Sequence, residues 1–213
     1  MSDKLALKEK ISSKKPAAHH TSPIKGRKTG FPGLSISRKF TRPGVNPLDE
    51  VKYVKRSSVI ANPDGSVVFE MKEVEVPDSW SQLATDIAAS KYFRKRGVPG
   101  IGRETSVRQL VHRVAHTLRL GGEWLGGYFK TKEDAETFEA ELTHLLLHQK
   151  GAFNSPVWFN CGLWHSYQIT GSGGNWVWNP KTGHIEETKD SYSRPQCSAC
   201  FIQSVGDDLM SIF

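Results

Sequence analysis

Apolar and polar side chains alternate through residues 53–76, and this period of two predicts β-strands. A turn is expected at Asn62-Pro63-Asp64-Gly65, because Pro fixes φ and Gly accepts a positive φ. The alternation slips by one residue between Met71 and Val74. An extra residue in one strand produces such a slip, so we expect a β-bulge near Lys72-Glu73.

Helical spacing of apolar residues replaces the alternation after Pro77-Asp78-Ser79, which end the strand and are expected to cap a first helix. Gly97-Val98-Pro99-Gly100 is expected to stop this helix. The apolar stripe predicted for it consists of Trp80, Leu83, Ala84, Ile87, Ala88 and Tyr92.

Two further helices are predicted, each with a capping box at its start. One begins at Ser106, where Gln109 completes the box, and is expected to close at Gly121-Gly122. The other covers about residues 131–150, with Asp134 at the capping-box position. Together with the strands, these helices predict a mixed α and β region before residue 151.

After Gly151 the helical spacing disappears, and aromatic residues and glycines become frequent. The run Phe153-Asn154-Ser155-Pro156-Val157-Trp158-Phe159-Asn160 is interpreted as a strand with polar ends, where barrels and α/β sheets place ligand contacts. A hairpin is predicted where residues 175–178 and 184–186 flank Asn179-Pro180-Lys181-Thr182-Gly183.

The positive charge lies at one end of the chain. The formal net charge is +7, and residues 1–46 hold eleven Lys or Arg against two acidic residues, whereas the remaining 167 hold eighteen basic and twenty acidic residues. We therefore expect a disordered basic tail over residues 1–46, followed by a strand-hairpin and helical region over 47–150 and a separate region over 151–213. A folded basic face that reads nucleic acid is disfavoured.

The chain has no apolar run of membrane-spanning length and no secretory signal at Met1-Ser2-Asp3-Lys4. Its three cysteines are an odd number, which disfavours a closed disulfide framework. A reducing compartment fits best, so we expect a cytoplasmic protein without a membrane partner.

The cysteines leave two kinds of chemistry open. Cys161-x3-His165 with Cys197-x2-Cys200 supplies four ligands of the types that zinc prefers, although Cys161 is equally suited to a small core position. Alternatively, Cys197 and Cys200 form a local disulfide switch, or Cys200 pairs with a distant thiol. A small zinc-binding or thiol-redox module is therefore the alternative function.

Two motifs together carry a family resemblance. Gly151-Ala152-Phe153-Asn154-Ser155-Pro156-Val157-Trp158-Phe159-Asn160 and Pro195-Gln196-Cys197-Ser198-Ala199-Cys200-Phe201-Ile202 strongly resemble adenosylcobalamin-dependent (class II) ribonucleotide reductases. Residues 80–93 and 103–109 are similar to the N-terminal region of that family. The likeness covers about residues 47–213.

The resemblance implies a fold, a cofactor and partners. It implies a mostly helical N-terminal region followed, over residues 151–213, by the first strands of a catalytic ten-stranded α/β barrel that is incomplete in this chain. It implies adenosylcobalamin, which initiates a thiyl radical, and an oxidoreductase that supplies deoxyribonucleotides for DNA synthesis. The implied partners are a ribonucleotide di- or triphosphate, an allosteric deoxynucleotide or ATP, a thioredoxin-type reductant and the remainder of the enzyme, a homodimer when complete.

The same resemblance assigns roles to residues. Cys200 matches the first thiol of the reducing pair, Ser155 a hydroxyl residue that meets the substrate, and Ala199 a residue whose backbone lines the ribose site. Asp207 matches a contact to the allosteric nucleotide, and Cys197 has no assigned role. The radical cysteine and the second reducing cysteine would lie after residue 213, so the chain alone is expected to be inactive.

Overall fold

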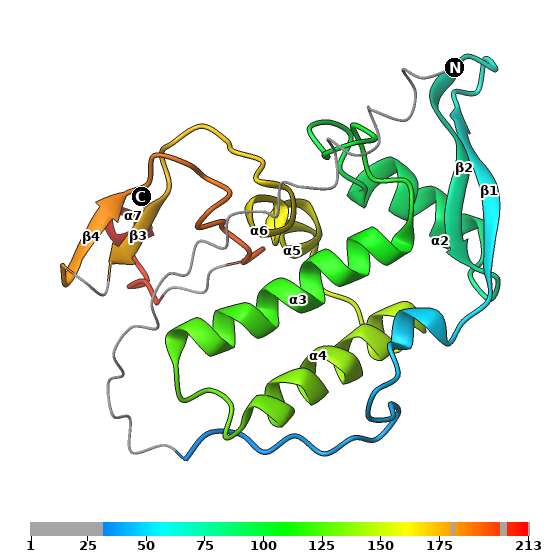
Figure 1. Cartoon of the computed structure of the whole chain (residues 1–213). Helices are drawn as coiled ribbons and strands as arrows, with labels where there is room; N and C mark the ends of the chain where they lie inside the picture. Colours follow the sequence, from blue (N-terminus) through cyan, green and yellow to red (C-terminus); the bar gives the residue numbers. More distant parts are fainter. Residues whose placement is uncertain (1–31, 180–181, 201–203, 213) are drawn as a thin grey trace, which may run out of the picture.

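Two long helices form the centre of the molecule. The computed structural model describes residues 32–179, 182–200 and 204–212. Helices α3 (Val107–Leu125) and α4 (Lys132–Leu147) lie side by side, with the β-hairpin beyond one end of α3 (Figure 1). The other elements are η1 (Pro47–Asp49), β1 (Tyr53–Ala61), β2 (Val67–Pro77), α2 (Gln82–Ile87), η2 (Ala88–Tyr92), α5 (Ser155–Asn160), α6 (Leu163–Tyr167), β3 (Trp176–Asn179), β4 (His184–Glu187) and α7 (Leu209–Ile212).

The predicted hairpin, its turn and its bulge are confirmed. β1 and β2 pair antiparallel, and Gly65 takes a φ of +86° in the turn between them. The pairing jumps from Arg56 opposite Val74 to Ser58 opposite Met71, and Glu73 has a φ of 59°. This extra residue returns the apolar side chains of β2 to the core face.

The capping boxes of α3 and α4 are confirmed, but the predicted end of α3 is wrong. The Ser106 side chain accepts from the Arg108 N–H, and the Gln109 side chain accepts from the Ser106 N–H. α3 continues past Gly121-Gly122 to Leu125. A Cβ on Gly122 would lie 2.6 Å from the Phe129 ring, so this glycine permits close packing inside the helix.

The first predicted helix is shorter and begins later than expected. Ser81, rather than residues 77–79, is the N-cap of α2, and its side chain accepts from the Ala84 N–H. A turn of π-helix, η2, follows directly. Leu83 is 69% exposed and Ile87 is 43% exposed, so the predicted stripe is wrong at these two positions.

Residues 155–160 form the helix α5, which corrects the strand predicted over residues 153–160. Asn154 is the N-cap of α5 and its side chain accepts from the Val157 N–H, while Pro156 lies in the first turn, where a missing N–H costs nothing. The first described element after residue 151 is therefore not a strand. The hairpin predicted nearby is confirmed as β3 and β4, although Pro180 and Lys181 of its turn lie outside the described residues.

Residues 32–46 are held on α4, so this part of the predicted tail is structured. The Ile36 N–H donates to the Asp134 carboxylate at 2.7 Å. Glu141 accepts from the N–H groups of Lys39, Phe40 and Thr41 at 2.9–3.2 Å. These carboxylate contacts replace the apolar burial that the segment lacks. Residues 1–31, the rest of the predicted tail, lie outside the described residues.

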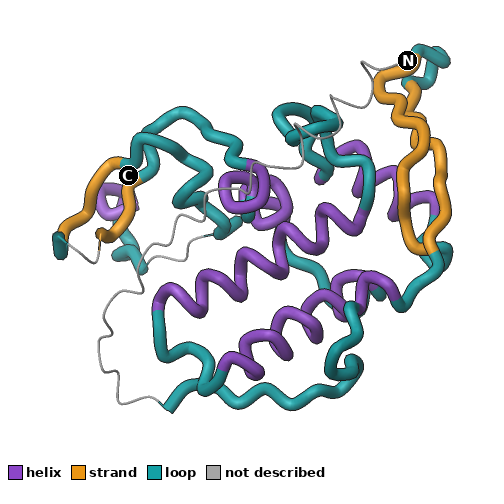
Figure 2. The backbone as a smooth tube through the Cα atoms, in the orientation of Figure 1, coloured by secondary structure: helices purple, strands orange, loops and turns teal. Residues whose placement is uncertain are grey.

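The main hydrophobic core lies where the hairpin, η2, α3, α4 and α5 meet. Long loops follow α6 and lead to the small sheet of β3 and β4 (Figure 2). None of the helices in the described ranges combines the length and the apolar composition needed to cross a bilayer. Fully or almost fully buried members of the core include Met71, Val74, Val76, Ala89, Phe93, Val107, Val111, Val114 and Leu147.

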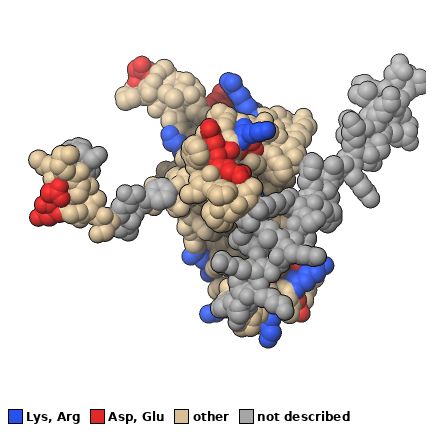
Figure 3. Space-filling model, turned by 90° about the vertical axis from the view of Figure 1, so that its left-hand side faces the viewer, with Lys and Arg blue, Asp and Glu red and all other residues tan. Residues whose placement is uncertain are grey.

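Acidic and basic side chains occur together on the surface of the folded part (Figure 3). Several are paired, for example Lys55 with Glu73 at 2.8 Å and Arg108 with Asp49 at 2.6 Å. This mixture agrees with the nearly balanced charge of residues 47–213.

Candidate functional site

Helix α5 carries the first of the predicted substrate-binding residues at its start. Ser155 is the first residue of α5 and is half-buried. Its Oγ lies 3.3 Å from the hydroxyl oxygen of Tyr92, which comes from η2. The capping Asn154 sets the direction of this turn, so two hydroxyl groups meet at the junction of η2 and α5.

The other end of α5 is held by a buried cation. The Arg113 guanidinium of α3 donates to the carbonyl oxygens of Trp158 and Cys161, at 3.1 Å and 2.6 Å. It also donates to the Glu104 carboxylate at 2.8 Å and 3.2 Å. The side chains of Arg113 and Glu104 are 1% and 0% exposed. A buried ion pair is tolerated when its remaining groups are satisfied, as they are here.

Glu104 has two further donors. The Arg94 N–H donates to it at 2.7 Å, and the Tyr167 hydroxyl donates at 2.8 Å. Burial, and next the Glu104 charge, raise the pKa of Tyr167 well above its usual range, so this phenol stays protonated as a donor. The loop before α3, the helix α5 and the helix α6 are therefore tied to one charged centre.

The turn between α5 and α6 requires glycine. Gly162 has a φ of +80°, and a Cβ there would lie 2.5 Å from the Arg113 carbonyl oxygen and 2.5 Å from Arg113 Cγ. Without a Cβ, the backbone at Gly162 packs directly against Arg113 of α3.

The segment that precedes Cys200 contacts the end of α5. The Asn160 side chain donates to the Gln196 carbonyl oxygen at 2.9 Å. Cys161 is buried, and the half-buried Cys197 packs against the same core. The structure therefore brings Cys161 and Cys197 together, although 35 residues separate them in the sequence.

The remaining predicted residues are on the surface. Ala199 and Cys200 are both exposed. Asp207 is exposed before α7, where Asp208 rather than Asp207 accepts from the N–H groups of Met210 and Ser211. The predicted run after Cys200, residues 201–203, lies outside the described residues. The structure thus places Cys200 on an anchored segment without assigning it a partner.

The predicted zinc site is not supported. In the part of the chain that the structure describes, no group of three or more His, Cys, Asp or Glu side chains is arranged to hold a metal ion. The His165 ring instead packs against Trp124, with ring centroids 4.4 Å apart. Burial, with a smaller effect of the Arg194 charge, lowers the pKa of His165 to about 4. This histidine is a neutral packing residue.

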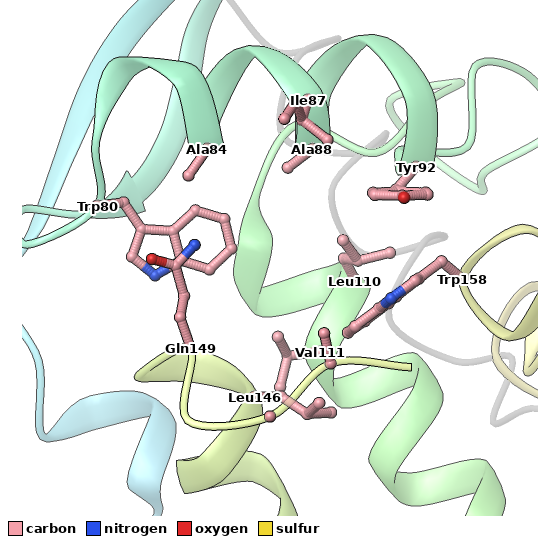
Figure 4. Close-up of a pocket in the computed structure, with 12 residues that line it drawn as sticks. Trp80, Ala84, Ile87, Ala88, Tyr92, Leu110, Val111, Leu146, Gln149 and Trp158 are labelled. Atoms are coloured by element: carbon pink, nitrogen blue, oxygen red, sulfur yellow. The ribbon is translucent and has the colours of Figure 1, made fainter. Parts of the chain in front are cut away.

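An apolar hollow lies next to the η2–α5 junction (Figure 4). Its volume is about 230 Å³, and Trp80, Tyr92 and Trp158 face it from different elements. The Trp80 indole N–H donates to the Leu147 carbonyl oxygen at 2.8 Å, which fixes one wall. The hollow is smaller than the roughly 300–1,000 Å³ of usual ligand pockets. The other lining residues are Ala84, Ile87, Ala88, Leu110, Val111, Leu146, Gln149, Gly151 and Ala152.

One sequence signal for the buried centre was not used. Arg113 lies between the apolar residues Val111 and Val114 of α3, so a charged residue occurs on a helix face that is buried. Its partner Glu104 lies in the loop before the helix, and no periodic pattern marks that position.

Comparisons with known proteins agree on one family. The family model described as class II vitamin B12-dependent ribonucleotide reductase matches residues 54–149. Vitamin B12-dependent ribonucleotide reductases of Agrobacterium fabrum and Rhodopirellula baltica are 41% and 45% identical to 84% of the chain. That of Streptomyces coelicolor is 42% identical over 90% of it. The chain spans only 16–17% of the length of these relatives.

Proposed function

Because the chain belongs to the family of class II vitamin B12-dependent ribonucleotide reductases, we propose that it forms the N-terminal part of an enzyme that converts ribonucleotides to deoxyribonucleotides. The observation that carries this proposal is the identity of 40–45% to relatives of that name over 84% of the chain. The rest of the enzyme, including the proposed ten-stranded barrel, comes from sequence that follows this region.

Cys200 is the proposed reducing thiol. In the reaction, the ribose loses its 2′-hydroxyl group as water and gains a hydrogen, while two thiols lose their hydrogens and join as a disulfide. Cys200 supplies one of these thiols and a cysteine of the remaining enzyme supplies the other. The exposure of Cys200 supports this role, because its sulfur is open to a substrate and to a partner thiol.

The anchoring of the preceding residues supports the same role. The Asn160–Gln196 hydrogen bond holds the backbone four residues before Cys200, and α5 is itself fixed by Arg113. A thiol that must meet a ribose carbon gains rate from such positioning. Ser155 and the Ala199 backbone are the proposed substrate contacts, and Asp207 is the proposed contact to an allosteric nucleotide.

The cofactor of this family is adenosylcobalamin. The hollow of about 230 Å³ does not fit it, since a corrin ring with its axial groups is much larger than this volume. We therefore place cofactor binding in the rest of the enzyme and assign no described residue to it. The proposed partners are a ribonucleotide, an allosteric nucleotide, a thioredoxin-type reductant and a second copy of the complete enzyme, in the cytoplasm.

The test is made in a full-length enzyme whose N-terminal region is this sequence. Cys200→Ser is expected to reduce multiple-turnover deoxynucleotide formation to the background without enzyme, whereas Cys197→Ser keeps activity near that of the unsubstituted protein. Deoxynucleotide formation is measured by chromatography with a dithiol reductant present. Sustained turnover by the Cys200→Ser enzyme would refute the proposed role of this thiol.

A further inference from the structure

Two cysteines outside the proposed reducing chemistry lie against each other. Cys161 ends α5 and is 4% exposed, and Cys197 is half-buried on the segment that follows Arg194. The residues just before them, Asn160 and Gln196, are joined by the 2.9 Å hydrogen bond. This bond holds the end of α5 beside the segment that contains Cys197. The two cysteines are therefore kept close by a contact that does not involve their sulfurs.

The two thiols share one part of the core and differ in electrostatic state. The hydrogen bond to Cys197, and next burial, raise the pKa of Cys161. The hydrogen bond from Cys161 lowers the pKa of Cys197. Cys197 is therefore the sulfur that more readily becomes the nucleophilic thiolate. Cys197 is also the more exposed of the two, so an oxidant can reach it first.

We infer that Cys161 and Cys197 form a redox-sensitive dithiol that a low-molecular-weight disulfide, such as oxidised glutathione, converts to an intramolecular disulfide. The Cys197 thiolate attacks one sulfur of the oxidant and releases one glutathione thiolate, which takes up a proton. Cys161 then loses its proton and attacks the Cys197 sulfur, which releases the second glutathione. Two protein thiols are oxidised, and one glutathione disulfide is reduced to two thiols.

Cys200 is the competing partner for Cys197 by sequence, because the two form a Cys-x-x-Cys pair. The structure favours Cys161 instead. Cys197 packs against the core that contains Cys161, whereas Cys200 is exposed. The inference also stands apart from the proposed reductase function, which gives neither Cys161 nor Cys197 a role, so either can fail without the other.

Formation of the disulfide has a structural consequence. It would join the end of α5 covalently to the segment three residues before Cys200. The position of Cys200 would then depend on the oxidation state of two other sulfurs. This is a modification site that senses the thiol–disulfide balance around the protein.

The experiment uses the purified 213-residue chain. The reduced protein is incubated with oxidised glutathione, free thiols are blocked with iodoacetamide, and peptides are mapped by mass spectrometry without reduction. The expected product is a peptide pair linked through Cys161 and Cys197, with Cys200 alkylated. The matched control Cys200→Ser is expected to give the same linked pair in the same yield.

A second variant separates the two steps. In Cys161→Ala/Cys200→Ser the attack by Cys197 remains, but no second thiol is left to resolve the product, so a mixed disulfide of Cys197 with glutathione is expected to accumulate. Circular dichroism checks that this variant is folded. A Cys197–Cys200 linkage in the unsubstituted chain, or Cys161 and Cys197 both alkylated after the glutathione treatment, would overturn the inference.

Discussion

Replacing Arg113 by methionine is expected to lower the free energy of unfolding by about 3–5 kcal/mol, the usual cost of removing one partner of a buried ion pair. The variant leaves the fully buried Glu104 carboxylate without its cation. It also removes the donors to the Trp158 and Cys161 carbonyl oxygens. Methionine fills a similar volume, so the loss of charge pairing and hydrogen bonds dominates the effect.

The assay is urea denaturation followed by tryptophan fluorescence, since Trp158 is buried beside the affected carbonyls. A matched exposed pair provides the control: Arg42 is 75% exposed and pairs with Glu50, so Arg42→Met is expected to cost about 0–1 kcal/mol. The double variant Glu104→Gln/Arg113→Met is expected to be more stable than Arg113→Met, because it leaves no buried charge. A loss below about 1 kcal/mol in Arg113→Met, with no recovery in the double variant, would refute the reasoning.

Two further stability predictions follow from the same region. Gly162→Ala combines a positive φ with Cβ contacts of 2.5 Å, so it is expected to lower the free energy of unfolding by about 2–4 kcal/mol in chemical denaturation. The control Gly100→Ala has a positive φ but open space around the Cβ, so it is expected to lower it by about 1–2 kcal/mol. Equal losses in the two variants would contradict this prediction. The folded state keeps His165 neutral down to a pKa of about 4, whereas the unfolded chain binds a proton near its ordinary value of 6.5. The free energy of unfolding is therefore expected to fall as the pH drops from about 6.5 to about 4, and to fall less steeply in His165→Gln. Denaturation midpoints measured across this pH range test this. The same pH dependence in both proteins would contradict a neutral, buried His165.

Local patterns predicted the parts of the fold that depend on neighbouring residues. The capping boxes at Ser106 and Thr131 are complete within four residues, so the sequence alone located the starts of α3 and α4. The bulge near Glu73 followed from a slip in one strand. One error arose where packing outside the helix mattered. Gly121-Gly122 was expected to end the helix, but α3 continues to Leu125, and the missing Cβ of Gly122 leaves room for the Phe129 ring.

The wrong strand at residues 153–160 has a different cause. Aromatic residues favoured a strand, while Asn154 and Pro156 already carried the signal for a helix start. For the site, the roles of Ser155, Ala199, Cys200 and Asp207 came from the family resemblance, and their chemistry remains a prediction. The sequence brought Cys161 and Cys197 together only as possible zinc ligands. Their packing without a metal depends on a hydrogen bond between segments 36 residues apart, which no local pattern predicts.

The shared attachment at Arg113 limits how this region can be recombined. The Arg113 guanidinium donates hydrogen bonds to the Glu104 carboxylate in the loop before α3. It also donates to two carbonyl oxygens at the end of α5. A chimera that takes only one of these segments from a relative keeps the network only where that relative has the same charged pair. A chimera that exchanges residues 94–113 and 158–167 together keeps both partners from one parent.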